Sequence, residues 1–197
     1  MATSAHFYLN WAKERIDEMD AALTSLQSKA AEVSADSRTA AEKIIADLRA
    51  KRDAFLSEMK KQTEASESAW LQAKARLETD WNAFQSGVTK YVEEFGQQAK
   101  QQEATFKETA AAQLKAWREA ADKMQADSAA FATDHRAAVD NAVQKMRADA
   151  AAAEANFQKL AKAGTQSWTA LTAALAESRG AFDRANQVAW DAFKRAS

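Results

Sequence analysis

Residues 9–33 of the chain read LNWAKERIDEMDAALTSLQSKAAEV. Apolar side chains recur there in steps of three and four residues, at Leu9, Ala12, Ile16, Met19, Leu23, Leu26, Ala30 and Val33. This spacing places them on one face of an α-helix, in the heptad pattern of a coiled-coil seam. Residues 34–37 interrupt the pattern and offer Asp36 or Ser37 as a helix N-cap. We therefore predict a first helix over about residues 5–33 and a second helix starting near residue 37.

Beyond residue 59 the apolar spacing changes to eleven residues. Three columns of mostly large side chains show it: Met59, Trp70 and Trp81; Phe84, Phe95, Phe106 and Trp117; and Met124, His135, Met146, Phe157 and Trp168. Eleven residues in three turns is about 3.67 residues per turn, which predicts a straight or weakly right-handed coil, whereas heptads predict a left-handed one.

The glycines place the expected breaks between these later helices. Gly87 and Gly164 indicate helices over about residues 37–85, 88–163 and 165–195. The pair Thr133-Asp134 is an alternative, earlier end for the helix over residues 88–163. If residues 88–163 are continuous, that helix spans roughly 110 Å at 1.5 Å per residue.

These patterns predict an all-α protein that forms a single elongated domain over residues 1–197, as a coiled coil or helical bundle of long amphipathic helices. The large side chains on the heptad and 11-residue faces are the predicted contacts of the helix seams, within the chain or with a second copy. They are Leu9, Ile16, Leu23, Trp70, Trp81, Phe84, Phe95, Phe106, Trp117, Met124, Phe157 and Trp168.

Composition supports this fold and excludes several others. The chain has no Pro, no Cys and only 4 Gly among 197 residues, and 50 residues are Ala. Disulfide scaffolds and thiolate metal sites are therefore excluded, and a hydrophobic content of 47% argues against disorder.

The charges are balanced and evenly spread, with 27 basic and 28 acidic residues. We expect no nucleic-acid partner, because such binding needs clustered Lys and Arg. No apolar run approaches the ~20 residues needed for a membrane-spanning helix, and the N-terminal residues do not resemble a signal peptide. A cytoplasmic protein is the expectation.

The sequence carries no pattern typical of a catalytic or cofactor site. His6 and His135 are not preceded at three residues by Glu, and neither belongs to a His-x-x-x-His pair. The four glycines are too far apart for a phosphate-binding loop. We therefore expect no metal, no cofactor and no enzymatic activity, and we interpret His135 as a seam position.

An internal repeat with an offset of 51 residues is also visible. Glu103-Ala104-Thr105-Phe106 matches Glu154-Ala155-Asn156-Phe157, and further matches are Trp117 with Trp168, Met124 with Leu175 and Phe131 with Phe182. A weaker third copy contains Trp70, Leu77 and Phe84. Repeats of this kind are typical of stacking helices and arrays.

The 11-residue repeats resemble those of exchangeable apolipoproteins, although that family interrupts its repeats with Pro, which this chain lacks. The size, the Ala content, the missing Cys and the segment Ala181-Phe182-Asp183-Arg184-Ala185-Asn186 are similar to phasins, the helical proteins that coat bacterial polyester granules. Neither resemblance includes a specific motif. Both imply amphipathic helices that lie on a lipid or granule surface.

Two functions follow from these observations. The first is a non-enzymatic structural or scaffolding protein that self-associates as a homo-oligomer through its aromatic and Ala-rich helix seams. The alternative is an amphipathic coat protein that binds lipid or a polyester granule. The six Trp residues distinguish the two, because the first function buries them in protein contacts and the second exposes some of them to the surface.

Overall fold

The computed structural model describes residues 5–63, 66–95, 99–129, 133–163 and 167–196. This part of the chain contains six helices and no strands, which confirms the predicted all-α helical bundle. The helices are α1 (Ala5–Ala30), α2 (Ala35–Lys61), α3 (Glu67–Phe95), α4 (Ala99–Ser128), α5 (Thr133–Ala163) and α6 (Trp168–Ala196). Each has 26 to 31 residues, so each is about 40–46 Å long at 1.5 Å per residue.

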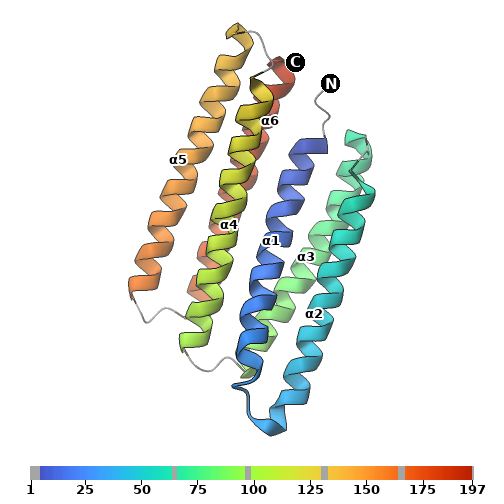
Figure 1. The fold of residues 1–197 in the computed structure, drawn as a ribbon, viewed down its shortest axis with the longest axis vertical. Helices are drawn as coiled ribbons and strands as arrows, with labels where there is room; N and C mark the ends of the chain where they lie inside the picture. Colours follow the sequence, from blue (N-terminus) through green and yellow to red (C-terminus); the bar gives the residue numbers. More distant parts are fainter. Residues whose placement is uncertain (1–4, 64–65, 96–98, 130–132, 164–166, 197) are drawn as a thin grey trace.

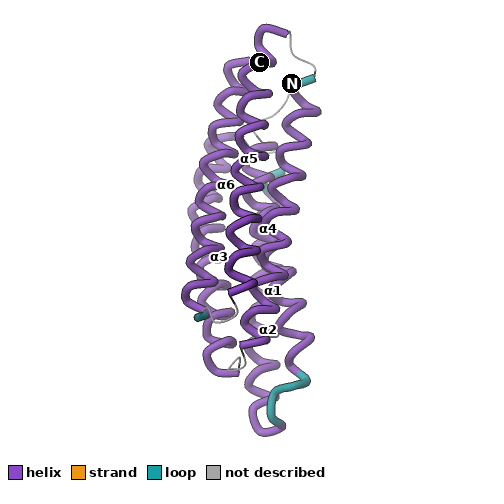
Figure 2. The backbone as a smooth tube through the Cα atoms, turned by 90° about the vertical axis from the view of Figure 1, so that its left-hand side faces the viewer, coloured by secondary structure: helices purple, strands orange, loops and turns teal. Residues whose placement is uncertain are grey.

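The helices form two three-helix units that lie side by side (Figure 1). In the first unit α1 packs on α2 and α3, and in the second α4 packs on α5 and α6. The units meet through α1 and α4, the most extensively packed pair in the bundle, and α6 also reaches α1. Seen from the side, the helices run nearly parallel to one long axis (Figure 2).

Each helix buries one apolar face because its sequence has the helical period. Along α3 the buried side chains follow steps of one, three or four residues: Trp70, Ala73, Leu77, Trp81, Phe84, Val88, Tyr91 and Val92. The predicted seam of α1 is likewise directed inward, with Ala12, Met19 and Leu26 fully buried. Packing of these faces supplies most of the stability of such helices.

The number of helices differs from the prediction. The expected helix over 37–85 is interrupted, because α2 ends at Lys61 and α3 begins at Glu67. The Ser66 hydroxyl accepts a hydrogen bond from the amide of Ala69 at 3.4 Å, and this capping contact starts α3. The expected helix over 88–163 is also wrong, since α3, α4 and α5 divide it.

Two predicted local signals also differ from the structure. Asp36 and Ser37 lie inside the first turn of α2, whose N-cap residue is Ser34. Gly87 lies inside α3 and does not end a helix. A Cβ atom at Gly87 would be 2.8 Å from Cδ2 of Leu48 in α2, so the glycine allows close approach of these two helices. The predicted end at Gly164 agrees with the end of α5 at Ala163.

The two units share a sequence pattern with an offset of 98 residues, and the 51-residue repeat stays a prediction. In α3 and α6 the matching residues are Trp70 and Trp168, Leu77 and Leu175, Phe84 and Phe182, and Phe95 and Phe193. In α1 and α4, Ile16 matches Leu114 and Leu26 matches Met124, and in α2 and α5, Ile45 matches Val143 and Leu48 matches Met146. Each helix of the first unit therefore has a counterpart in the second, α1 in α4, α2 in α5 and α3 in α6.

Candidate functional site

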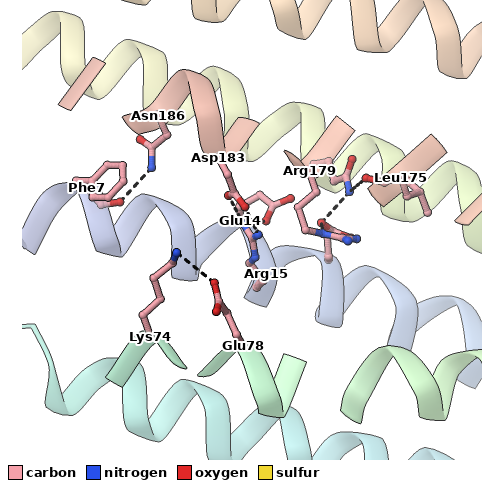
Figure 3. Close-up of polar contacts among 11 residues, drawn as sticks. Phe7, Glu14, Arg15, Lys74, Glu78, Leu175, Arg179, Asp183 and Asn186 are labelled. Atoms are coloured by element: carbon pink, nitrogen blue, oxygen red, sulfur yellow. Dashed lines mark hydrogen bonds and ion pairs between the residues drawn. The ribbon is translucent and has the colours of Figure 1, made fainter. Parts of the chain in front are cut away.

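A buried cluster of charged side chains joins α1 to α6 (Figure 3). The guanidinium of Arg179 donates from Nε to Oε1 of Glu18 at 2.9 Å and from Nη2 to Oε2 at 2.7 Å. Arg15 forms a second two-bond pair with Asp183, at 2.8 and 2.7 Å, and also donates to Oε2 of Glu14 at 2.8 Å. An Arg and a carboxylate that share two parallel hydrogen bonds form one of the strongest ion pairs available to these side chains.

Most of the cluster is removed from water, although the Asp183 side chain at its edge is 36% exposed. The Glu18 side chain is 1% exposed and the Arg179 side chain 8% exposed. Gln113 of α4 donates from Nε2 to Oε1 of Glu18 at 2.8 Å and to the carbonyl oxygen of Leu175 at 3.1 Å. Such neighbours are needed because buried charges are stable only when they are paired and hydrogen-bonded.

Two tryptophans cover the guanidinium groups. Arg15 lies 4.6 Å from the ring centre of Trp11, and Arg179 lies 4.7 Å from that of Trp81. A cation over an indole face is attracted by the ring and is shielded from solvent. The cluster thus merges with the aromatic core and is not a surface feature.

The pKa values of the two glutamates of α1 shift in opposite directions. Burial raises the pKa of Glu14 well above its usual value, and the negative charge of Glu18 raises it further against the effect of Arg15. Burial also acts to raise the pKa of Glu18, but the Arg179 charge and the hydrogen bonds to Glu18 outweigh it and lower that pKa. Burial and the Glu18 charge thus oppose ionisation of Glu14, whereas Arg179 favours the ionised form of Glu18.

Most of the seam residues predicted from the sequence are core residues of this single chain. Leu9 and Phe95 are half-buried, and the other ten are buried. Several pack directly across helices: Phe106 lies edge-on to Phe157 at 5.5 Å, and Trp117 lies edge-on to Phe182 at 5.5 Å. Their predicted role as contacts between copies of the chain stays a prediction.

Sequence reasoning missed the charged cluster altogether. Glu14 and Glu18 are spaced like ordinary surface charges on a helix, and Arg179 lies 161 residues away from Glu18. One signal was available, because Arg15 and Glu18 fall on the same helix face as Trp11 and Ala22, which are buried. Charged residues in an apolar stripe indicate a buried partner. The side chains of His6 and His135 lie outside the described part of the chain.

No helix among the described residues combines the length and the apolar character that crossing a membrane requires. Within the same residues, no group of three or more His, Cys, Asp or Glu side chains could hold a metal ion. Comparison of the chain with models of protein families, with curated proteins and with solved structures finds no match.

Proposed function

We propose that the chain is a non-enzymatic structural protein, a rigid helical bundle that self-associates and serves as a spacer or scaffold. The observation that carries this proposal is the burial of all six Trp residues within one chain, at 9% exposure or less. A core so rich in aromatic side chains gives a stiff, stable element. The paired charges of α1 and α6 fasten its two units in one arrangement.

The surface supports the same proposal. Among the described residues, the large apolar side chains that remain strongly exposed are Leu71, at 57%, and Val188, at 51%. The rest of the exposed surface carries acidic and basic residues in nearly equal numbers, many of them paired along or between helices. Such a surface neither repels a second copy nor attracts nucleic acid or anionic lipid strongly.

The surface that we assign to self-association is the groove between α5 and α6. It has a volume of about 720 Å³, and its walls include Ala142, Ala153, Ala174, Ala181 and Ala185, with Val188 among the lining residues. Alanine-rich walls allow a second helix to approach closely, as in other helix–helix contacts between large and small residues.

The test is the molar mass measured by light scattering over a range of protein concentrations. We expect a mass above that of one 21.6 kDa chain for the native protein and a shift toward the monomer for Val188→Glu. Leu71→Glu is the matched control, because Leu71 is equally exposed but lies on α3. A native protein that stays monomeric at every concentration would rule out self-association.

Tryptophan fluorescence separates the scaffold from the coat protein. With every Trp buried, emission should be blue-shifted in the absence of lipid and should not change when phosphatidylcholine vesicles are added. An emission maximum that moves to the blue only with vesicles would favour the coat protein. The proposed scaffold keeps the cytoplasmic location expected from the sequence.

A further inference from the structure

A cavity of about 380 Å³ lies between α3 and α6, above a floor formed by α1 and α4. Its apolar walls include Trp81, Phe84 and Val88 of α3 and Trp168 and Leu175 of α6. The floor contains Thr105 and Thr109 of α4, and the Glu18–Arg179 pair lies at one side. The volume falls within the roughly 300–1,000 Å³ of known small-molecule pockets.

Comparison of the two units explains why side chains do not fill this space. Thr105 and Thr109 occupy the positions that match Phe7 and Trp11, 98 residues earlier in α1. Phe7 and Trp11 are 6% and 2% exposed, and the indole of Trp11 packs against Phe55 at 6.3 Å. In the first unit, therefore, two large rings fill the region that two small threonine side chains leave open in the second.

The charged cluster adds to this asymmetry. The Arg15–Asp183 and Glu18–Arg179 pairs hold α6 against α1. The residues at the matching positions are Gln113, Gln85, Ala116 and Trp81, which supply no such charge pairs. Among the described residues, α3 accordingly makes no comparable contact with α4.

We propose that this cavity is a binding site for an uncharged small molecule with an aromatic or aliphatic body and one hydrogen-bonding group. The indoles of Trp81 and Trp168 and the ring of Phe84 provide apolar contact area. The hydroxyl of Thr109 donates to the carbonyl oxygen of Thr105 at 2.8 Å and keeps lone pairs that can accept a bond from a ligand.

The charges beside the cavity determine that the ligand is uncharged. Glu18 and Arg179 neutralise each other through two hydrogen bonds, and Arg179 also lies over Trp81 at 4.7 Å. A ligand anion would compete with Glu18, and a ligand cation would compete with Arg179. Either would lose its hydration without gaining an unpaired partner, which is unfavourable in a buried site.

The test is a fluorescence titration of the full chain with N-phenyl-1-naphthylamine, an uncharged aromatic amine that brightens in apolar surroundings. We expect saturable binding of about one dye per chain. Thr109→Trp restores the side chain found at the matching position of the first unit, and Ala176→Trp places a ring at an exposed position of the cavity lining. Each should weaken dye binding by about tenfold or more.

Ala46→Trp is the matched control, because Ala46 is an exposed alanine on α2 and outside the cavity. It should change dye affinity by less than about twofold. If circular dichroism shows that Thr109→Trp has unfolded, Ala176→Trp decides the question alone. Non-saturable binding to the native chain, or equal losses at Ala176 and Ala46, would overturn the proposal.

A charged analogue tests the ligand class. 8-Anilinonaphthalene-1-sulfonate has the same ring system with an added sulfonate, and we expect it to bind about tenfold more weakly than the uncharged dye. Equal or tighter binding of the sulfonate would contradict the assignment of an uncharged ligand. These titrations are independent of the molar mass, so the site and the proposed self-association succeed or fail separately.

Discussion

The carboxyl group of Glu14 makes the stability of the bundle depend on pH. Its pKa is raised in the folded chain, first by burial and then by the charge of Glu18. The stability that this group contributes is therefore complete below its ordinary pKa of about 4.3 and is lost as the pH rises through the folded-state pKa. The pKa of Glu18 is lowered in the folded chain, so the pH dependence of its effect is reversed. The stability that Glu18 contributes is lost as the pH falls through its folded-state pKa.

Glu14→Gln should remove the first effect, because glutamine resembles the protonated carboxyl group and does not ionise. As the pH rises above the ordinary glutamate pKa of about 4.3, the free energy of unfolding measured in urea should fall less for Glu14→Gln than for the native chain. The exposed substitution Glu42→Gln is the control and should follow the native curve. Identical curves for Glu14→Gln and the native chain would show that Glu14 is ionised in the fold.

Trp117 tests the packing of the aromatic core. Its side chain is 1% exposed and lies edge-on to Phe182. Trp117→Ala should lower the free energy of unfolding by roughly 3–5 kcal/mol, the usual cost of removing a large core side chain. Lys115→Ala should change it by less than about 0.5 kcal/mol, because the Lys115 side chain is 71% exposed. A small effect at both positions would contradict the packing described for α4 and α6.

At the scale of the helix, two glycines within α-helices give opposite expectations. A Cβ at Gly180 of α6 would lie 3.4 Å from a nitrogen of the Arg184 side chain, so Gly180→Ala should stabilise the protein by roughly 0.5–1 kcal/mol through helix propensity. At Gly87 the same change would meet the buried Leu48 at 2.8 Å. Gly87→Ala should therefore be destabilising, and thermal melts of both variants would show the difference in sign.

Local sequence predicted the helices well where a boundary had a local cause. The turn between α1 and α2 follows from the interrupted heptads, and α5 ends at Ala163, the end predicted from the sequence. The start of α3 was missed because it depends on a hydroxyl cap by Ser66 in a segment without Gly or Pro. The helix break predicted at Gly87 is wrong because this glycine makes room for Leu48, a residue of another helix that local sequence does not reveal. Contacts between distant segments, such as Glu18 with Arg179, leave only faint local signals.

The whole molecule is shorter than the sequence period suggests. The 11-residue spacing of apolar side chains continues from one helix to the next, although the chain reverses direction between them. The expected 110 Å helix is therefore replaced by described helices of at most 31 residues. Small-angle scattering of the monomer should give a radius of gyration slightly above the ~16 Å of a compact chain of this length. A value near that of a 110 Å rod, roughly twice as large, would contradict the bundle.

Phe7, near the start of α1, packs against Trp190, near the end of α6. This contact has a consequence for the order in which the helices can be connected. Their ring centres are 6.0 Å apart, and Asn186 donates to the carbonyl oxygen of Phe7 at 3.2 Å. Both ends of the chain therefore lie at one end of the bundle (Figure 1). A circular permutant that starts at residue 99 and joins the old termini by a short flexible linker should fold to the same bundle, with its two three-helix units in exchanged order.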